Sequence, residues 1–308
     1  MTTMLFTHPA CLEHDPGSHH PESPARLRAA LEGLGAPEFA RLERREAPQA
    51  AAEDLWRVHP RRHVERILRA VPKSGHVAID ADTVISPRSG EAALRAAGAV
   101  VAAVDSVIAG EVDNAFCAVR PPGHHAEPEQ AMGFCLFNNI AIGALHARAA
   151  HGLDRIAVVD FDVHHGNGTQ AAFETDDRLF YASTHQYPLY PGTGAASETG
   201  VGNVVNVPLR PMSGSSQFRS GMSQRVLPAL DAFCPELVLI SAGFDAHRRD
   251  PLAQLMLEEA DYVWITEQLL EIAYRHARGR VVSALEGGYD LAALSACVAA
   301  HVRVLMSV

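Results

Sequence analysis

The sequence has few of the features that mark secreted proteins, zinc fingers or membrane proteins. Its five cysteines are scattered, and no two of them have CxxC spacing. Scattered thiols in odd number are typical of a reducing compartment, so we expect a cytoplasmic protein without disulfides. The first residues contain no basic segment followed by an apolar run, so we expect no secretory signal. No stretch approaches the roughly 18 consecutive apolar residues that a membrane span requires.

Positive charge is also scarce in this chain. The formal net charge of −10 argues against general binding to nucleic acids. Apolar residues, in contrast, make up 47% of the 308 residues, which is enough for one large α/β domain with a deep core. We find no internal repeat and no long linker, so the sequence predicts a single domain over residues 1–308.

Short apolar runs alternate with helical patterns over most of the sequence. The runs are β-branched or aromatic and apolar on both faces, as buried parallel strands are. Their order predicts right-handed crossovers and a parallel sheet covered by helices on both faces. Strands are expected at residues 115–120, 155–163, 178–184, 203–209, 236–242 and 280–285. Helices are expected at residues 24–34, 90–109, 138–150, 215–232, 258–277 and 291–305.

Four of the expected strands run directly into unusual polar segments. AFCAVR is followed by PPGHHAE, AVVDFDV by HHGNG, LVLISAG by FDAHRRDP, and VVSALE by GGYD. In α/β proteins with parallel sheets, ligands bind beyond the carboxyl ends of the strands. Four such junctions at one edge of the same sheet therefore predict a functional site at that edge.

The second junction has the composition of a metal site. Side chains alternate between the two faces of a strand, so Asp160, Asp162 and His164 are expected to share one face. A strand end with solvated charges and a helix cap would explain these residues equally well. Asp245, after a neighbouring strand, offers a further ligand. An Asp-His-Asp set leaves positions open for water and substrate, as in catalytic zinc sites, although Fe(II), Co(II) or Mn(II) would also suit it.

Two other junctions carry groups that could transfer or donate protons. His124 and His125 follow a rigid Pro-Pro-Gly turn at the end of a strand. Adjacent histidines are more often surface or core residues, but beside a metal they could carry protons near neutral pH. Tyr289 follows a Gly-Gly pair and could donate its hydroxyl to a developing oxyanion. A tyrosine there is more often a packing residue, so only its place after a strand supports this role.

Taken in order, these segments resemble the signature blocks of the histone deacetylase superfamily, and most closely its class II and bacterial deacetylase-like branch. The blocks are RPPGHHAE, GFCLFNN, VDFDVHHGNGTQ, YPGTG, SAGFDAHRRDPL and LEGGYD. The resemblance extends from HHPESPARL near the amino terminus to LEGGYDL near the carboxyl terminus. It implies an arginase-like three-layer α/β fold, in which helices flank a mostly parallel central sheet, and a zinc-dependent amide hydrolase.

The resemblance also implies roles for individual residues. His125 resembles the general base that activates the attacking water and later protonates the leaving amine. His124 resembles its electrostatic partner, and Tyr289 matches the tyrosine that binds the substrate carbonyl. The three residues that match the ligands of the single zinc ion are Asp162, His164 and Asp245.

A further set of residues resembles the supporting groups of the family's site. Asp160 resembles the carboxylate that orients His124. Asn167 stands beside His125, where class I members carry aspartate and class II members carry asparagine. A neutral amide there would still orient the ring but would raise its basicity less. The resemblance also implies a potassium ion near the zinc, held by side chains of Asp160 and Ser183 and by main-chain oxygens of Asp162, His164 and Thr184.

A narrow tunnel lined by aromatic side chains is the substrate site that the resemblance implies. Phe134 matches one wall. Tyr190 stands where many class II members carry phenylalanine, so this wall would be slightly more polar. Gly133 is expected along the channel, and His20 and Pro21 resemble residues at its mouth.

Leu252, in the DPL segment, bears on the choice of substrate. The polyamine-specific branch carries a glutamate at the matching position, where it meets the distant ammonium group of the substrate. Leucine cannot form that ion pair, so we expect deacylation of lysine side chains in peptides or proteins. The alternative is hydrolysis of acetylpolyamines or other small acylamines. A catalytically silent acyl-lysine binder and arginase-like manganese chemistry fit the residues less well.

Overall fold

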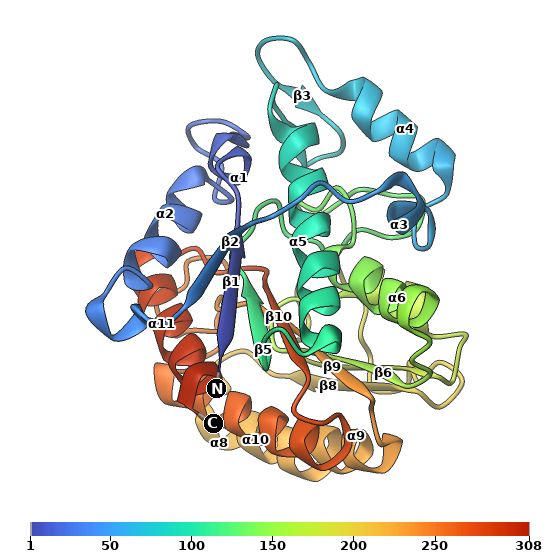
Figure 1. The fold of residues 1–308 in the computed structure, drawn as a ribbon. Helices are drawn as coiled ribbons and strands as arrows, with labels where there is room; N and C mark the ends of the chain where they lie inside the picture. Colours follow the sequence, from blue (N-terminus) through green and yellow to red (C-terminus); the bar gives the residue numbers. More distant parts are fainter. Residues whose placement is uncertain (1, 308) are drawn as a thin grey trace.

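A parallel sheet with eight strands forms the centre of the molecule, in a computed structural model that describes residues 2–307. Every neighbouring pair of its strands is parallel, and helices cover both faces (Figure 1). The predicted three-layer α/β fold is therefore confirmed. In spatial order the strands are β2 (Glu43–Glu46), β1 (Thr3–Thr7), β5 (Asn114–Cys117), β10 (Val281–Leu285), β9 (Leu237–Ala242), β6 (Ile156–Asp160), β7 (Leu179–Gln186) and β8 (Val204–Leu209).

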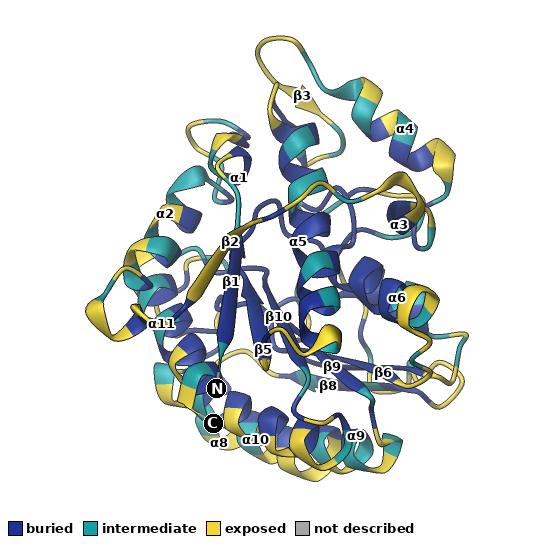
Figure 2. Cartoon of the chain, in the orientation of Figure 1, coloured by how far each residue is buried: buried dark blue, intermediate teal, exposed yellow. Residues whose placement is uncertain are grey.

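Two helices, α5 (Ser89–Ala109) and α6 (Asn139–His151), pack on one face of the sheet. On the other face lie α10 (Glu259–His276) and α11 (Leu291–Ser307), and α11 also contacts α2 (Pro24–Gly33). All five helices lie where the sequence pattern predicts them. Their buried sides face the dark central strands in Figure 2, and their exposed sides face outward.

The single helix predicted at residues 215–232 is wrong in one respect. The chain forms α8 (Ser215–Gly221), then one π-helical turn (Met222–Val226), then α9 (Leu227–Phe233). Pro228 stands in the first turn of α9 and has no backbone N–H to donate. The regular hydrogen-bond ladder cannot continue through it, which accounts for the change of register.

Several short elements have no counterpart among the predicted ones. β2 has the sequence ERRE and is exposed at every position, so it has no apolar pattern to reveal it. Charged residues are common on such edge strands, because they discourage pairing with another chain. The other elements of this group are β1, α1 (Ala10–Glu13), a 3₁₀ turn (Pro37–Phe39), α3 (Ala52–Trp56), α4 (Arg61–Ala70), the antiparallel pair β3 (Val77–Ala78) and β4 (Val84–Ile85), and α7 (Asn167–Phe173).

Among the described residues, α5 is the one helix that is long and apolar enough to cross a membrane. In the fold, 67% of its most apolar stretch is buried. The helix packs against α6 and against β1, β5 and β10. This burial is typical of a core helix, which needs the same apolar surface.

Candidate active site

The four polar segments meet because their strands are neighbours. β5, β10, β9 and β6 are consecutive in the sheet, and one segment follows each of them. The carboxyl ends of β6, β9 and β10 also lie at matching positions in the sheet, since Ser241 pairs with Asp160 on one side and with Ala284 on the other. The loops beyond their carboxyl ends therefore converge on one place, as the sequence predicts.

Asp162, His164 and Asp245 form a buried group whose candidate ligand atoms all lie within 4.8 Å of one another. The Nδ1 atom of His164 lies 3.1 Å from Oδ1 of Asp162 and 3.2 Å from Oδ2 of Asp245. Oδ2 of Asp245 is buried and makes no hydrogen bond within residues 2–307. Burying a carboxylate oxygen without a donor is costly, and a cation at this point would offset that cost. The donor set therefore fits a divalent metal ion such as zinc.

Glycine backbones close tightly around these carboxylates. The amide of Gly287 donates to Oδ2 of Asp162 at 2.8 Å, and the amide of Val163 donates to Oδ1 of Asp245 at 2.8 Å. A Cβ atom at Gly287 would overlap Oδ2 of Asp245, and one at Gly243 would overlap the Asp162 carboxylate. These two glycines are needed for space, and together with the amides they hold the carboxylates in place.

Asp160 lies beside this group. The expectation that Asp160, Asp162 and His164 share one face of a strand is wrong. β6 ends at Asp160 and the chain then bends, so strand alternation does not extend to Asp162 and His164. Oδ2 of Asp160 lies 2.9 Å from Nδ1 of His124 and accepts a hydrogen bond from Tyr181 at 3.1 Å. The bend, rather than a shared strand face, brings Asp162 and His164 together.

His125 is held by a neutral amide. Its Nδ1 atom lies 2.8 Å from Oδ1 of Asn167, while Nδ2 of Asn167 donates to Glu127 at 2.8 Å. The amide oxygen can only accept, so Nδ1 of His125 carries the proton and Nε2 has a free lone pair. Burial lowers the pKa of His125 well below its ordinary value, and the nearby His124 and His164 lower it further.

His124 has the opposite electrostatic character. Burial alone would lower the pKa of His124, but the carboxylates of Asp160 and Asp162 raise it to about 10. The two imidazole rings have centroids only 4.0 Å apart. A protonated His124 beside a neutral His125 is therefore the stable combination at neutral pH.

A cavity of about 230 Å³ opens onto these groups. Phe134, Tyr190 and Leu252 line it, as the motif resemblance implies, and the Tyr190 ring lies 5.1 Å from the His125 ring between centroids. Gly133 has a φ of +58°, and a Cβ there would strike the His125 ring. Its other lining residues are Asp82, Pro122, His124, His125, His164, Leu189, Gly287 and Tyr289.

The two residues expected at the mouth lie slightly apart from this cavity. Neither His20 nor Pro21 is among its lining residues in the described part of the chain. The His20 ring packs edge-on against Phe134, with centroids 4.7 Å apart, and its Nε2 lies 2.8 Å from the carbonyl oxygen of Asp82. His20 therefore contacts the wall at Phe134 without lining the cavity.

Comparison with known proteins shows the family. A family model described as the histone deacetylase domain matches residues 20–305. The chain is 41% identical to the histone deacetylase-like amidohydrolase of Pseudomonas aeruginosa, over 99% of this chain and 86% of that protein. The chain belongs to the histone deacetylase family. As a member, it is a deacetylase of the amidohydrolase type.

Other members of the deacetylase family share most of the chain. Histone deacetylase 14, chloroplastic, of Arabidopsis thaliana is 40% identical, over 98% of this chain and 76% of that protein. The crystal structure of the HDA15 HD domain matches with a TM-score of 0.94 at 37% identity, covering 99% of this chain and 89% of that one. The fold of this deacetylase therefore agrees with that crystal structure over nearly the whole chain.

Two buried charged residues of this deacetylase support the site, although the sequence analysis assigned no role to either of them. Oε2 of Glu286 accepts hydrogen bonds from the amides of Gly123 and His124, at 2.7 and 3.2 Å. Arg26 donates to the carbonyl oxygens of Gly288 and Glu286, at 2.6 and 2.5 Å, and its guanidinium lies 4.7 Å from the centroid of the Tyr289 ring. Glu286 could have been noticed as a carboxylate directly after a strand. Arg26 lies within the HHPESPARL segment of the resemblance, but its helical position did not indicate that it would meet Tyr289.

The expected potassium ligands lie next to the same strand ends of the deacetylase. Asp160 pairs with Ser183 across β6 and β7, and both residues are fully buried. Oγ1 of Thr184 is buried and has no hydrogen-bond partner among the described residues. The expected ligand at Thr184 is its main-chain oxygen, which these contacts do not test, so the potassium site stays a prediction.

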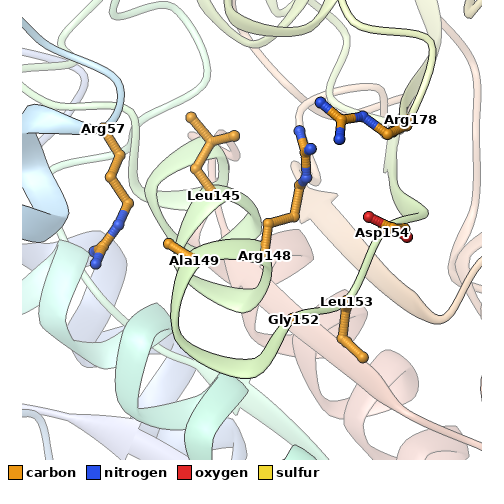
Figure 3. Close-up of a pocket in the computed structure, with 8 residues that line it drawn as sticks. All are labelled: Arg57, Leu145, Arg148, Ala149, Gly152, Leu153, Asp154 and Arg178. Carbon is orange, nitrogen blue, oxygen red and sulfur yellow. The ribbon is translucent and has the colours of Figure 1, made fainter.

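A larger cavity, of about 510 Å³, lies at the opposite end of the deacetylase sheet (Figure 3). It borders the turns that precede β6 and β7. Arg148 and Arg178 point toward each other and both donate to Asp176, whereas Arg57 extends away from them. Arg57 pairs with Asp54, and no histidine is among the described residues that line this cavity. The smaller cavity, which the tandem histidines line, is therefore the candidate active site. The remaining lining residues are Leu145, Ala149, Gly152, Leu153 and Asp154.

Proposed function

We propose that this chain hydrolyses the acyl amide of lysine side chains in peptides or proteins, with one zinc ion held by Asp162, His164 and Asp245. The supporting observation is that one cavity joins His164, the two tandem histidines and Tyr289 to an apolar channel. When bound, zinc supplies Lewis acidity to the acyl carbonyl and to the attacking water. A potassium ion at Asp160 and Ser183, and a single catalytic domain over residues 1–308, belong to the same proposal.

His125 would act as the general base. Its proton is held on Nδ1 by Asn167, so Nε2 is the nitrogen that can accept a proton from the attacking water. The lowered pKa of His125 keeps the ring unprotonated at neutral pH. As the carbon–nitrogen bond breaks, the same imidazole passes its proton to the leaving amine.

His124 and Tyr289 would stabilise the negative charge that develops on the acyl oxygen. His124 is protonated at neutral pH, because the carboxylates of Asp160 and Asp162 raise its pKa to about 10. Burial raises the pKa of Tyr289 well above its ordinary value, so the phenol keeps its proton and can donate a hydrogen bond. Arg26, packed against the ring, positions the phenol.

The channel suits a linear aliphatic stem. Phe134, Leu189, Tyr190 and Leu252 supply most of its apolar lining, and the four methylene groups of lysine would be buried against them. Leu252 offers no charge to a cationic substrate end. An apolar wall at this point favours an acyl-lysine whose only polar group inside the channel is the amide itself.

A small acylated amine is the second candidate substrate, and Asp82 is the residue that could bind its charged end. Its carboxylate lines the same cavity and could pair with an ammonium group. It could equally accept a hydrogen bond from the backbone of a peptide substrate, so Asp82 supports either class. Oδ1 of Asp82 already accepts hydrogen bonds from Thr83 and Gly133, at 3.0 and 3.2 Å.

A comparison of kcat/KM for an acetyl-lysine peptide and for acetylspermidine, on zinc-loaded protein, tests the proposal. We expect the peptide to be preferred. We also expect Leu252→Glu to improve hydrolysis of acetylspermidine relative to the peptide, with Leu252→Met as the uncharged control. A preference of the unaltered protein for the polyamine of about 10²-fold or more, which is about 2.7 kcal/mol of differential transition-state binding, would reverse the assignment.

A further inference from the structure

A second group of metal-binding side chains lies far from the catalytic loops, where the carboxyl-terminal ends of α5 and α6 pack together. Asp105 belongs to α5, and His146 and His151 belong to α6. The candidate ligand atoms of these three residues all lie within 4.8 Å of one another. Because α5 and α6 lead into β5 and β6, the group sits at the amino end of the sheet, opposite the candidate active site.

One carboxylate oxygen in this group faces two imidazoles. Oδ1 of Asp105 lies 2.7 Å from Nε2 of His146 and 2.6 Å from Nε2 of His151. Without a metal ion, both Nε2 atoms must carry protons to donate to this oxygen. A metal ion placed between the three atoms would replace both protons and bind two imidazole nitrogens and one carboxylate oxygen.

Asp54 orients the His146 ring so that its Nε2 could bind such an ion. Its Oδ1 lies 2.9 Å from Nδ1 of His146, on the side of the ring that faces away from Asp105. A proton held on Nδ1 by this carboxylate leaves the Nε2 lone pair free for the metal. Metal-binding histidines in proteins almost always donate their other N–H to such a partner. Asp54 also pairs with Arg57, so the two carboxylates of the group outnumber the single guanidinium, which favours a cation.

The distances between the ligand atoms and the exposure of the side chains are both compatible with binding of a metal ion. Ligand atoms around a tetrahedral zinc ion stand about 3.3 Å apart, so the side chains would need to separate by roughly 0.6 Å. The side chains of Asp105 and His151 are 49% and 26% exposed, so they can adjust and an ion can enter from solvent. His146, only 11% exposed, provides the fixed side of the site.

We propose that Asp105, His146 and His151 bind a divalent transition-metal ion such as zinc, at a site separate from the catalytic one. Two imidazoles and a carboxylate suit zinc, copper and nickel rather than magnesium or calcium, which prefer oxygen ligands. Water would complete the shell. The ion would cross-link α5 and α6, and the contact of Asp54 with His146 would connect α3 to them. Its role would therefore be structural.

Zinc stoichiometry tests this site directly. The protein is prepared without a histidine tag, stripped with a chelator, re-equilibrated at buffered free zinc in the low micromolar range, and assayed for zinc per chain. The unaltered protein should hold two ions, and His151→Gln, which keeps a hydrogen-bond donor toward Asp105, should hold one. Asp245→Asn should hold the second ion alone, and the double variant should hold none. His276→Gln removes a histidine that pairs with Asp231 at 2.7 Å, and this matched control should still hold two.

Thermal unfolding separates this site from the catalytic one. Zinc should raise the Tm of Asp245→Asn, and the rise should disappear in the double variant, because only binding to the folded state stabilises it. His151→Gln should keep the deacetylase activity of the unaltered protein. Equal zinc content in the unaltered protein and His151→Gln would overturn the proposal. Loss of zinc in Asp245→Asn alone would bear only on the catalytic site, so the two failures are distinguishable.

Discussion

Nδ1 of His125 lies 2.8 Å from Oδ1 of Asn167, and the other atom of that amide group, Nδ2, donates to Glu127. The contact to Glu127 decides which way the amide faces, and so decides which nitrogen of His125 carries the proton. A neutral amide in this place orients the base without adding a charge that would protonate it. The basicity of His125 is therefore set mainly by its burial and by the cation on His124.

Replacing this amide by a carboxylate should change the pH dependence of the reaction. Asn167→Asp, combined with Glu127→Gln to avoid repulsion, should raise the pKa of His125, because a nearby anion favours the imidazolium. The acidic limb of kcat/KM reports protonation of the base, so it should move to higher pH by about 1–2 units. The pH profile of zinc-saturated protein measures this, with Glu127→Gln alone as the control. Superimposable profiles would show that His125 is not the titrating base.

Removing the hydroxyl of Tyr289 should slow turnover without releasing metal. Loss of one oxyanion donor typically lowers kcat by about 10²–10³, and we expect Tyr289→Phe to fall in that range. The ring and its contact with Arg26 are retained, so the protein should fold and bind zinc normally. Tyr187→Phe, at an exposed tyrosine outside the cavity lining, is the control. A kcat equal to that of the unaltered protein would remove Tyr289 from the mechanism.

A single methyl group at Gly133 should disable the site. A Cβ there would lie 2.5 Å from Cδ2 of His125, too close for any real contact, so Gly133→Ala must displace either the loop or the base. Gly75→Ala provides a matched control, because Gly75 also has a positive φ (+71°) but nothing lies within 4 Å of the added atom. Both variants carry the backbone strain of an alanine at positive φ, a cost of about 1 kcal/mol. Only Gly133→Ala should lose most of its kcat/KM, and equal activities would contradict the steric argument.

Acid should destabilise the fold through buried histidines, of which His301 is the clearest case. Burial lowers the pKa of His301 to about 3, while in the unfolded chain a histidine titrates near about 6.5. Between these values the unfolded state binds one more proton than the folded state, so stability falls as the pH falls. The contribution reaches about 1.4 kcal/mol per pH unit.

Urea unfolding at a series of pH values between about 6.5 and 4 measures this effect. His301→Gln will lose hydrogen bonds with Thr266 and Ser283, so its absolute stability should be lower. Its free energy of unfolding should nevertheless decline less steeply with acid. His19→Gln, at an exposed histidine, should leave the slope unchanged. An unchanged slope in His301→Gln would show that this residue does not couple folding to pH.

Local sequence patterns predicted the buried strands and the chemical groups that follow them. Buried parallel strands need apolar residues on both faces, so β5, β6, β7, β8, β9 and β10 were visible as short apolar runs. Chemical groups at the carboxyl ends of such strands are confined to one edge of the sheet. That confinement allowed the histidine pair, the carboxylates and the tyrosine to be chosen before their distances were known.

The order of the strands and the long-range partners depended on the tertiary structure. β10 lies between β5 and β9, which no local pattern indicates, and this order brings Tyr289 between the histidine loop and Asp245. Arg26 meets Tyr289 across more than 260 positions of sequence, and His146 meets Asp105 only because two helices pack together. Periodicity reports which face of an element is buried, but it carries no information on what that face will meet. Contacts between distant segments arise from the packing of the whole chain, and so the contacts of the supporting charges and of the second histidine group became evident only in the folded molecule.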